Sequence, residues 1–196
     1  MRRWVVYQVL TDRFAGPEGR EIRGLSTTGP AYRWNQFAGG TYQGLQSRLS
    51  YLRNLGMTAL WISPVVAQSI LPAGPGKKEH HGYHGYWARD FEQPSRELGS
   101  EEELSRLLQA CAQHDISPIL DVVLNHTSDE HEWACAARSG DPTYQGYYYT
   151  WPDRSEPDRY EQSMPEIFPE TAPGNFTWND EMGRWVMTVF HDYQWD

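Results

Sequence analysis

The stretch SPILDVVLNH, residues 117–126, decides the fold. Its first eight residues are mostly apolar and include the β-branched Ile119, Val122 and Val123, which is typical of a short buried strand. Asp121 interrupts the apolar run, and a buried carboxylate is costly unless it is paired. With a strand period of two, Asp121, Val123 and Asn125 share one face, and His126 follows at the carboxyl-terminal exit. Ligands of parallel α/β folds bind at that end, so Asp121 is either a functional carboxylate or the partner of an arginine on a neighbouring strand.

Two further strand-like runs precede this stretch, WVVYQVL at residues 4–10 and ALWISPVV at residues 59–66. Between them, leucines recur at helical spacing, and Gly56 stands where a C-terminal cap would. These leucines are Leu45, Leu49 and Leu52. A second helix is predicted after Ser100, because Ser100 and Glu103 have the spacing of a capping box. The order strand, helix, strand, helix, strand predicts a parallel sheet with crossover helices.

The character of the sequence changes after about residue 127. Residues 141–183 contain six prolines among many aromatic and acidic residues. We interpret this segment as an irregular insertion after the third strand. Within the insertion we expect one short strand, RWVMTVF at residues 184–190.

The composition excludes several classes of protein. The 196 residues carry 17 Lys and Arg against 26 Asp and Glu, a formal charge of −9, which argues against a nucleic-acid partner. No apolar run approaches the roughly 18 residues that a membrane span needs, and the amino terminus is a poor signal peptide. The two cysteines, Cys111 and Cys135, are too few for a disulfide framework and fit a reducing compartment. We therefore expect a cytoplasmic protein without a membrane partner.

Aromatic residues make up 14% of the chain, with 9 Trp and 12 Tyr. Tyrosine and tryptophan combine a flat apolar face, which can stack on a sugar ring, with a polar group. Composition alone leaves two interpretations open, a sugar-binding surface and a loop-rich core filled by rings.

Four ordered segments resemble the α-amylase family of glycoside hydrolases, family 13. DVVLNH at residues 121–126 resembles the first short motif of the family, and YQVLTDRF at residues 7–14 resembles its first strand. Residues 39–65 are similar to its first helix and second strand. YHGYWARDF at residues 83–91 is similar to the loop after the second strand.

This resemblance implies an α/β fold, the N-terminal part of a TIM (β/α)8 barrel with a small irregular inserted domain after strand 3. Residues 1–126 would form the first three β/α units, and residues 127–196 a segment like the inserted domain B of the family. The rest of the barrel would lie outside these residues, because a full barrel takes about 250 residues.

The resemblance also assigns roles to individual residues. Tyr86 matches the tyrosine that stacks on the sugar ring beside the scissile bond, and His126 matches the histidine that hydrogen-bonds the 6-hydroxyl of that sugar. Asp121 matches a carboxylate that orders the site by pairing with an arginine, here outside the chain. Asn125 matches a residue that ligates a structural calcium ion in many members, so calcium is a possible cofactor.

Tyr83, Trp87 and His84 are further candidates for contact with the substrate. With His80 and His81, His84 forms an HHxxH pattern that suggests a metal site. The pattern has no evident acidic or cysteine partner, so lining of the cleft or simple solvation is favoured for these histidines.

The carboxylates that perform the family's chemistry are not found. A retaining glycosidase needs two carboxyl groups roughly 5 Å apart, and the family places its nucleophile in a GxRxD-like motif that these residues lack. FHDY at residues 190–193 lies too early to be the late motif that it superficially resembles. We expect the chain to be a truncated portion of an enzyme, inactive alone and completed by a missing C-terminal part or a second chain.

Two features point to different members of the family. Tyr83 stands where members that grip a chain end usually have Asp, which favours an open groove and hydrolysis of α-1,4-glucans such as starch with retention. The segment after residue 127, including GDPTYQGYYYTWPDRSEPDRY, resembles the insertion of amylosucrase-type enzymes, so a transglucosylase acting on sucrose or α-glucosides is the alternative. A non-catalytic carbohydrate-binding or split-chain module stays open as a different class.

Overall fold

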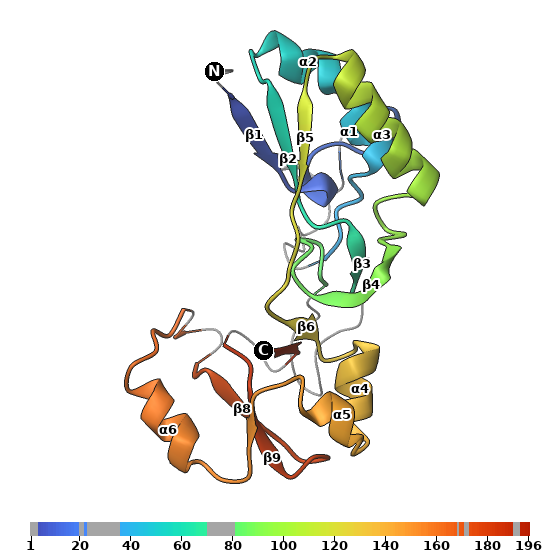
Figure 1. Ribbon diagram of the computed structural model, residues 1–196. Coiled ribbons are helices and arrows are strands. Elements are labelled where there is room, and N and C mark those ends of the chain that lie inside the picture. Colours follow the sequence, from blue (N-terminus) through green and yellow to red (C-terminus); the bar gives the residue numbers. More distant parts are fainter. Residues whose placement is uncertain are drawn as a thin grey trace. The chain divides into compact units, whose positions relative to one another are not determined.

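The computed structural model divides into two compact units. The first contains residues up to Tyr86 and Phe91–Val122, and the second contains Trp87–Asp90 and Val123–Asp196. Both units are drawn in Figure 1. The residues that the structure describes are 4–19, 22, 36–69, 81–167, 169–170, 173–189 and 193–196.

A parallel sheet of three strands forms the centre of the first unit. The strands are β1 (Val6–Val9), β2 (Ala59–Ile62) and β5 (Ser117–Leu120), and β2 lies between the other two. In register, Val9 pairs with Ile62, and Ile62 pairs with Leu120. The predicted parallel order of the three apolar runs is therefore confirmed.

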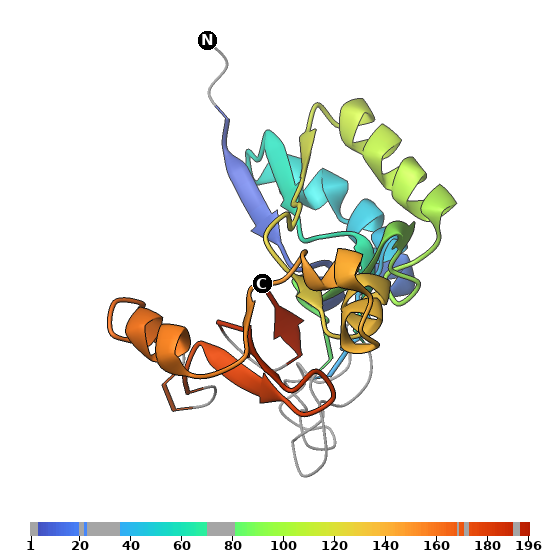
Figure 2. The same ribbon diagram turned by 60° about the horizontal axis from the view of Figure 1, so that its bottom comes forward.

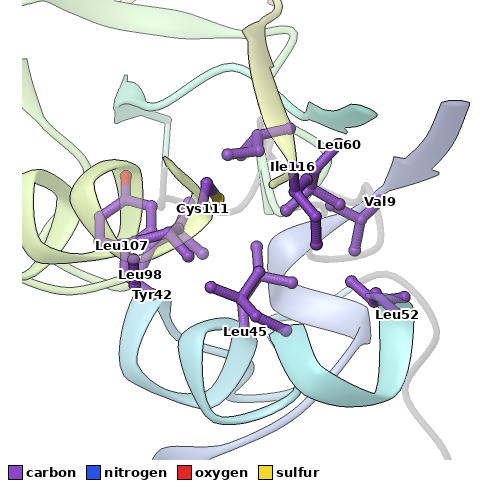
Figure 3. Close-up of a cluster of buried hydrophobic side chains, with 12 residues drawn as sticks. Val9, Tyr42, Leu45, Leu52, Leu60, Leu98, Leu107, Cys111 and Ile116 are labelled. Carbon is purple, nitrogen blue, oxygen red and sulfur yellow. The ribbon is translucent and has the colours of Figure 1, made fainter. Parts of the chain in front are cut away.

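Three helices cover one face of this sheet (Figure 1). They are α1 (Tyr42–Ser47), α2 (Leu49–Asn54) and α3 (Glu101–Gln113). The leucine repeat predicted one helix, but Arg48 separates α1 from α2 with φ −105° and ψ 4°. The side chains between sheet and helices are buried and point toward one another (Figure 3). They include Val9, Leu45, Leu52, Leu60, Leu107 and Ile116.

Local signals at the helix ends behave as the sequence predicts. The Ser100 hydroxyl accepts a hydrogen bond from the Glu103 amide at 3.3 Å, and the Glu103 carboxylate accepts one from the Ser100 amide at 2.8 Å. This is the predicted capping box. Gly56 follows α2 with a φ of 87°, a conformation that favours glycine after a helix.

Close backbone contact joins the segment after β1 to the start of α1. That segment contains the short 3-10 helices η1 (Thr11–Arg13) and η2 (Pro17–Gly19). A Cβ on Gly44 of α1 would lie 2.0 Å from the Ala15 carbonyl oxygen, and the Thr41 amide donates to the same oxygen at 3.0 Å. Only glycine allows this close approach, because the atom that a Cβ would meet is a main-chain carbonyl oxygen, which cannot move aside as a flexible side chain can.

In the described residues, the sheet face opposite the helices is uncovered (Figure 1). Gln8, Trp61 and Ile119 are register partners on that face, and Trp61 is 38% exposed. Asp121 directly follows β5. Its side chain is expected on the same face as that of Ile119, because side chains two positions apart along a strand point to the same face.

The predicted strand at residues 117–124 is too long. β5 ends at Leu120, and Val122 is 64% exposed. The Asp121 amide still donates to the Ile62 carbonyl at 3.0 Å. Pro64 lacks the amide hydrogen that the next ladder bond would need, so the pairing stops there. Asp121 is accordingly a half-buried residue at the end of the strand rather than a buried one inside it.

A two-stranded sheet, β3 (Val66–Gln68) with β4 (Ala88–Pro94), follows the carboxyl end of β2. The Ser95 amide donates to the Val65 carbonyl at 2.8 Å beside this pair. Residues 70–80 lie outside the described part of the chain. Among the described residues, no helix is both long and apolar enough to cross a membrane.

The second unit contains an antiparallel sheet that the sequence did not predict. Its strands are β7 (Thr150–Trp151), β9 (Arg184–Met187) and β8 (Phe176–Asn179), with β9 in the middle. The expectation of a single strand in this segment is wrong. β7 has only two residues, and β8 mixes Thr and Asn with its aromatic residues, so neither gives a clear apolar run.

Helices lie on both sides of that sheet. α4 (Glu132–Arg138) and α5 (Pro142–Gln145) lie on one side of β8 and β9 and α6 (Ser155–Glu161) on the other, in both views (Figures 1 and 2). A short antiparallel pair, β6 (Thr127–Ser128) with β10 (Gln194–Trp195), completes the unit. The buried cluster of the unit contains Ala134, Ala137, Tyr148, Val186 and Trp195.

Candidate active site

Two of the predicted site residues meet at the carboxyl end of β5. The Tyr86 hydroxyl donates a hydrogen bond of 2.8 Å to the Asp121 Oδ2 atom. Both side chains are half-buried, so the pair is reachable from solvent. The bond joins residues 35 positions apart in the sequence and holds the carboxylate beside the end of β5.

A glycine turn brings Tyr86 to this position. Gly85 has a φ of +94°, and a Cβ there would lie 2.7 Å from the Pro64 Cδ atom. The Gly85 amide donates to the Gly82 carbonyl at 3.0 Å, and the Gly82 amide donates to the Ser69 carbonyl at 2.8 Å. The turn therefore packs on the segment after β2, and glycine is required at its tightest point.

Burial, together with the nearby Asp121 carboxylate, raises the pKa of Tyr86 to about 12. The phenol therefore keeps its proton at neutral pH and remains a hydrogen-bond donor. A protonated phenol beside a carboxylate holds that carboxylate in one orientation, which is the positioning that a substrate-binding group requires.

His84 and Tyr83 extend the site along the same turn. The His84 Nδ1 atom accepts a hydrogen bond of 3.0 Å from the Tyr86 amide, and the His84 and Tyr86 rings stack with centroids 5.7 Å apart. Tyr83 meets the His84 ring edge-on at 5.2 Å. The Arg13 guanidinium lies 3.8 Å from the centroid of the Tyr83 ring. These rings form a continuous aromatic string within the first unit.

Arg13 and Asp12 are residues of this region that the sequence analysis did not single out. The buried Asp12 carboxylate accepts hydrogen bonds from the Ala38 and Gly39 amides at 2.9–3.0 Å. Burial raises the pKa of Asp12, while these amides and Arg13 oppose that shift. The Arg13 guanidinium donates to the Gln36 carbonyl at 2.7 Å, so the pair fixes residues 36–39, and the same guanidinium lies against the Tyr83 ring. The sequence signal that could have identified Asp12 and Arg13 is their position as a charged pair shortly after an apolar strand.

The HHxxH pattern gives no metal site in the described residues. His80 lies outside them, and the His84 Nδ1 atom accepts the Tyr86 amide. His81 packs against Phe37 with ring centroids 5.6 Å apart. The described part of the chain contains no group of three His, Cys, Asp or Glu residues that could hold a metal ion.

Asn125 and His126 lie in the second unit, beside a carboxylate that the sequence analysis missed. The Asn125 amide donates to the Asp196 Oδ1 atom at 2.5 Å, and the His126 Nδ1 atom lies 3.9 Å from the same oxygen. Burial raises the pKa of Asp196, and contacts with Gln194, His126 and Asn125 oppose the shift. No local pattern links residues 71 positions apart, so only the fold reveals this cluster.

Asn125, the residue predicted to bind calcium, belongs to this cluster. Calcium takes about six to eight oxygen ligands. Asn125 directs its amide nitrogen at Asp196, and Asp196 also accepts from Gln194 at 3.3 Å. Asn125 and Asp196 nevertheless bring two side chains with hard oxygen atoms together, and a calcium ion would need further oxygen ligands besides these two. Calcium binding at Asn125 stays a prediction.

Trp87 is buried in the second unit, with 8% of its surface exposed. Its ring packs edge-on against Tyr193 with centroids 4.3 Å apart. The structure thus gathers Tyr83, His84, Tyr86 and Asp121 in the first unit, and it places Trp87, Asn125 and His126 in the second. The contact of each of these residues with substrate stays a prediction.

Comparison with known proteins identifies the family to which the chain belongs. The profile described as the alpha amylase catalytic domain matches residues 8–196. The chain belongs to the α-amylase family. This glycoside hydrolase family and its TIM-barrel fold account for the parallel sheet, which is the N-terminal part of such a barrel.

Relatives within the family differ in activity. Alpha-amylase 3 of Schizosaccharomyces pombe is 36% identical over 128 residues, which are 63% of this chain and 21% of that protein. Trehalose synthase of Pimelobacter sp. is 32% identical over 161 residues, which are 81% of this chain and 26% of that protein. A mutant of MutB in complex with the substrate sucrose superposes with a TM-score of 0.70 and 26% identity, over 98% of this chain and 29% of that one. The chain thus spans about a quarter of the length of these relatives.

Proposed function

We propose that the protein to which this chain belongs hydrolyses α-1,4-linked glucans with retention of configuration. The observation that carries the proposal is the hydrogen bond from Tyr86 to Asp121, at the carboxyl end of a parallel barrel strand. In TIM-barrel enzymes the loops at this end build the active site. The family profile over residues 8–196 and the relatedness to alpha-amylases support the same reaction class.

Each residue has a separate task in this proposal. The Tyr86 ring stacks on the sugar beside the scissile bond, since an aromatic ring offers an apolar face to sugar C–H groups. Asp121 is held by the Tyr86 hydroxyl and orders the site through an arginine elsewhere in the protein. His126, in the second unit, donates a hydrogen bond to the 6-hydroxyl of a glucose unit of the substrate. Together these groups lower the entropic cost of reaching the reactive geometry.

The carboxylates that form and cleave the glycosyl-enzyme bond are proposed to lie outside residues 1–196. In the retaining mechanism, one carboxylate attacks the anomeric carbon while a carboxylic acid protonates the leaving oxygen. The group that gave up its proton then takes one from a water molecule as that water attacks the anomeric carbon, and the bond to the enzyme carboxylate breaks. Two displacements with inversion keep the anomeric configuration. These residues hold the substrate, and other barrel strands supply the chemistry.

The uncovered sheet face supports the proposal that other barrel strands complete the site. Trp61 is 38% exposed there, and Val122 is 64% exposed beyond the end of β5. The inside of a complete barrel is a packed core, and burial of apolar surface stabilises by about 25 cal/mol per Å². We propose that further strands, from the remainder of the same protein or from a second chain, cover this face. Residues 1–196 alone would then be inactive and prone to associate through the edges of β1 and β5.

A transglucosylase that acts on sucrose is the second candidate. It is supported by the insertion-like segment after residue 127 and by the superposition on MutB in complex with sucrose. Tyr83 favours the glucan hydrolase, because a tyrosine at that position would leave a groove in which a polymer can continue.

Parallel incubations of the intact protein with starch and with sucrose separate the two candidates. Release of reducing ends from starch with no fructose from sucrose supports the hydrolase. Fructose release together with new glucosides supports the transglucosylase. Inactivity toward both, in a folded sample, would contradict each proposal and favour a carbohydrate-binding module.

A further inference from the structure

A row of tryptophans crosses the sheet of the second unit. Trp151 of β7 pairs in register with Trp185 of β9, and Trp185 pairs with Trp178 of β8. Directly paired residues on neighbouring strands share one face of a sheet. Val186 lies on the opposite face and belongs to the buried cluster with Ala134 and Ala137. The tryptophans therefore lie on the face turned away from that cluster.

Other aromatic rings continue this face. Tyr149 lies two residues before Trp151 and is 65% exposed, with its ring nearly parallel to that of Trp151 at 6.4 Å. Tyr160 of α6 is 44% exposed and contacts Trp151 and Phe176 at 5.8 and 6.3 Å. We call the set the aromatic face. It consists of Tyr149, Trp151, Tyr160, Phe176, Trp178 and Trp185.

Hydrogen bonds and charges fix parts of the aromatic face in place. Trp178 is 41% exposed, and its indole N–H donates to the Asp180 carboxylate at 2.9 Å. The Arg154 guanidinium lies 4.5 Å from the centroid of the Trp185 ring and also pairs with Asp158 at 2.6 Å. The exposed Trp178 ring thus lies next to the Trp185 ring, and their centroids are 5.7 Å apart. The Arg154 guanidinium lies over the Trp185 ring.

Arg154 also borders a shallow, open cavity of about 570 Å³. Its other lining residues are Glu161, Met164, Glu166, Pro173 and Gly174. The Glu161 carboxylate accepts hydrogen bonds from the Asn175 amide and side chain at 2.7 and 2.8 Å, and Glu166 accepts from the Gly174 amide at 2.7 Å. A carboxylate has about four acceptor positions, so both anchored carboxylates can accept further bonds from hydroxyl groups.

We propose that the aromatic face and this cavity form a binding site for an α-glucan chain, built from residues other than Tyr86 and Asp121. The inference rests on the proposed function, which supplies α-glucans as the ligand. Trp178 would stack on one glucose unit, and the next units would meet the guanidinium of Arg154 and the carboxylates of the cavity.

The chemistry favours a glucan over a protein partner. Cores of protein interfaces are enriched in aromatic residues and Arg but depleted of Asp and Glu, whereas here the carboxylates of Asp158 and Asp180 contact Arg154 and the Trp178 indole. A sugar needs both kinds of group, since its C–H faces are apolar and its hydroxyls take part in hydrogen bonds. The exposed Trp178 ring, the Arg154 guanidinium and the carboxylates of the cavity would each contact a different sugar unit of the same polymer.

Native electrophoresis of the intact protein through gels containing soluble amylopectin tests the site. Wild type is expected to be retarded, and Trp178→Ala is expected to weaken retention by about 3- to 10-fold in apparent Kd, as for loss of one stacked ring. Tyr147→Ala is the matched control, because Tyr147 is an exposed tyrosine of the same unit that contacts Trp133 and Tyr144 instead. Trp178→Phe keeps a ring and should restore most of the retention.

Turnover of maltotriose is measured on the same samples to separate this inference from the proposed function. Trp178→Ala should leave that turnover unchanged. Equal retention of wild type, Trp178→Ala and Tyr147→Ala would overturn the inference while leaving the proposed function intact. Concentration-dependent dimerisation that Trp178→Ala abolishes, without glucan retention of wild type, would assign the face to self-association and would also overturn it.

Discussion

Replacing Tyr86 with phenylalanine removes one hydroxyl and keeps the ring. In the structure this hydroxyl donates to Asp121 at 2.8 Å. Hydrogen bonds to charged groups contribute about 1.5–3 kcal/mol, and the half-buried pair belongs at the lower end of that range. About 1.4 kcal/mol corresponds to a tenfold change in rate. We therefore expect Tyr86→Phe to lower kcat/KM of the intact enzyme about tenfold, and Tyr86→Ala to lower it about 10- to 100-fold because the ring is lost as well.

The assay is initial-rate hydrolysis of a maltooligosaccharide between pH 5 and 9, with the thermal transition of each variant measured in parallel. Because the pKa of Tyr86 is raised to about 12, the ratio of wild type to Tyr86→Phe should stay constant over this range. Tyr51→Phe, on an exposed tyrosine of α2, is the control and should change neither quantity. Normal kcat/KM in Tyr86→Phe, or a loss of rate explained by unfolding, would refute the assignment of Tyr86 to the substrate site.

Three further substitutions test other parts of the account. Gly44→Ala should destabilise the first unit by about 1–3 kcal/mol, seen in thermal unfolding, because its Cβ would lie 2.0 Å from the Ala15 carbonyl oxygen; an unchanged transition would contradict the close packing. Ser100→Ala should lower stability by about 1 kcal/mol through loss of the capping box, which denaturant titration can measure. His126→Ala should lower turnover roughly 10- to 100-fold with little effect on folding, and normal kinetics would remove His126 from the site.

Much of the first unit follows from the sequence, because its signals are local. Short apolar runs predicted the three parallel strands, and the spacing of Ser100 and Glu103 predicted the start of α3. The predicted end of β5 was too late, because apolar residues continue in the sequence to residue 124 although the strand ends at Leu120. The structure ends the pairing where Pro64, two residues after the neighbouring strand β2, provides no amide hydrogen.

The second unit was harder to predict, because its order depends on contacts between distant residues. Asp196 meets Asn125 across 71 positions, and β7 has only two residues. The row that Trp151, Trp178 and Trp185 form exists only through strand register. High aromatic content gave a general indication of sugar binding but could not show which rings share a face.

The most direct test of the central claim is the anomeric configuration of the first product. The intact protein is mixed with maltopentaose, and proton NMR spectra are recorded before mutarotation equilibrates the sugars. The account predicts that the α-anomer of the newly formed reducing end appears first, as a double displacement through a covalent glycosyl-enzyme requires. Initial appearance of the β-anomer would contradict it.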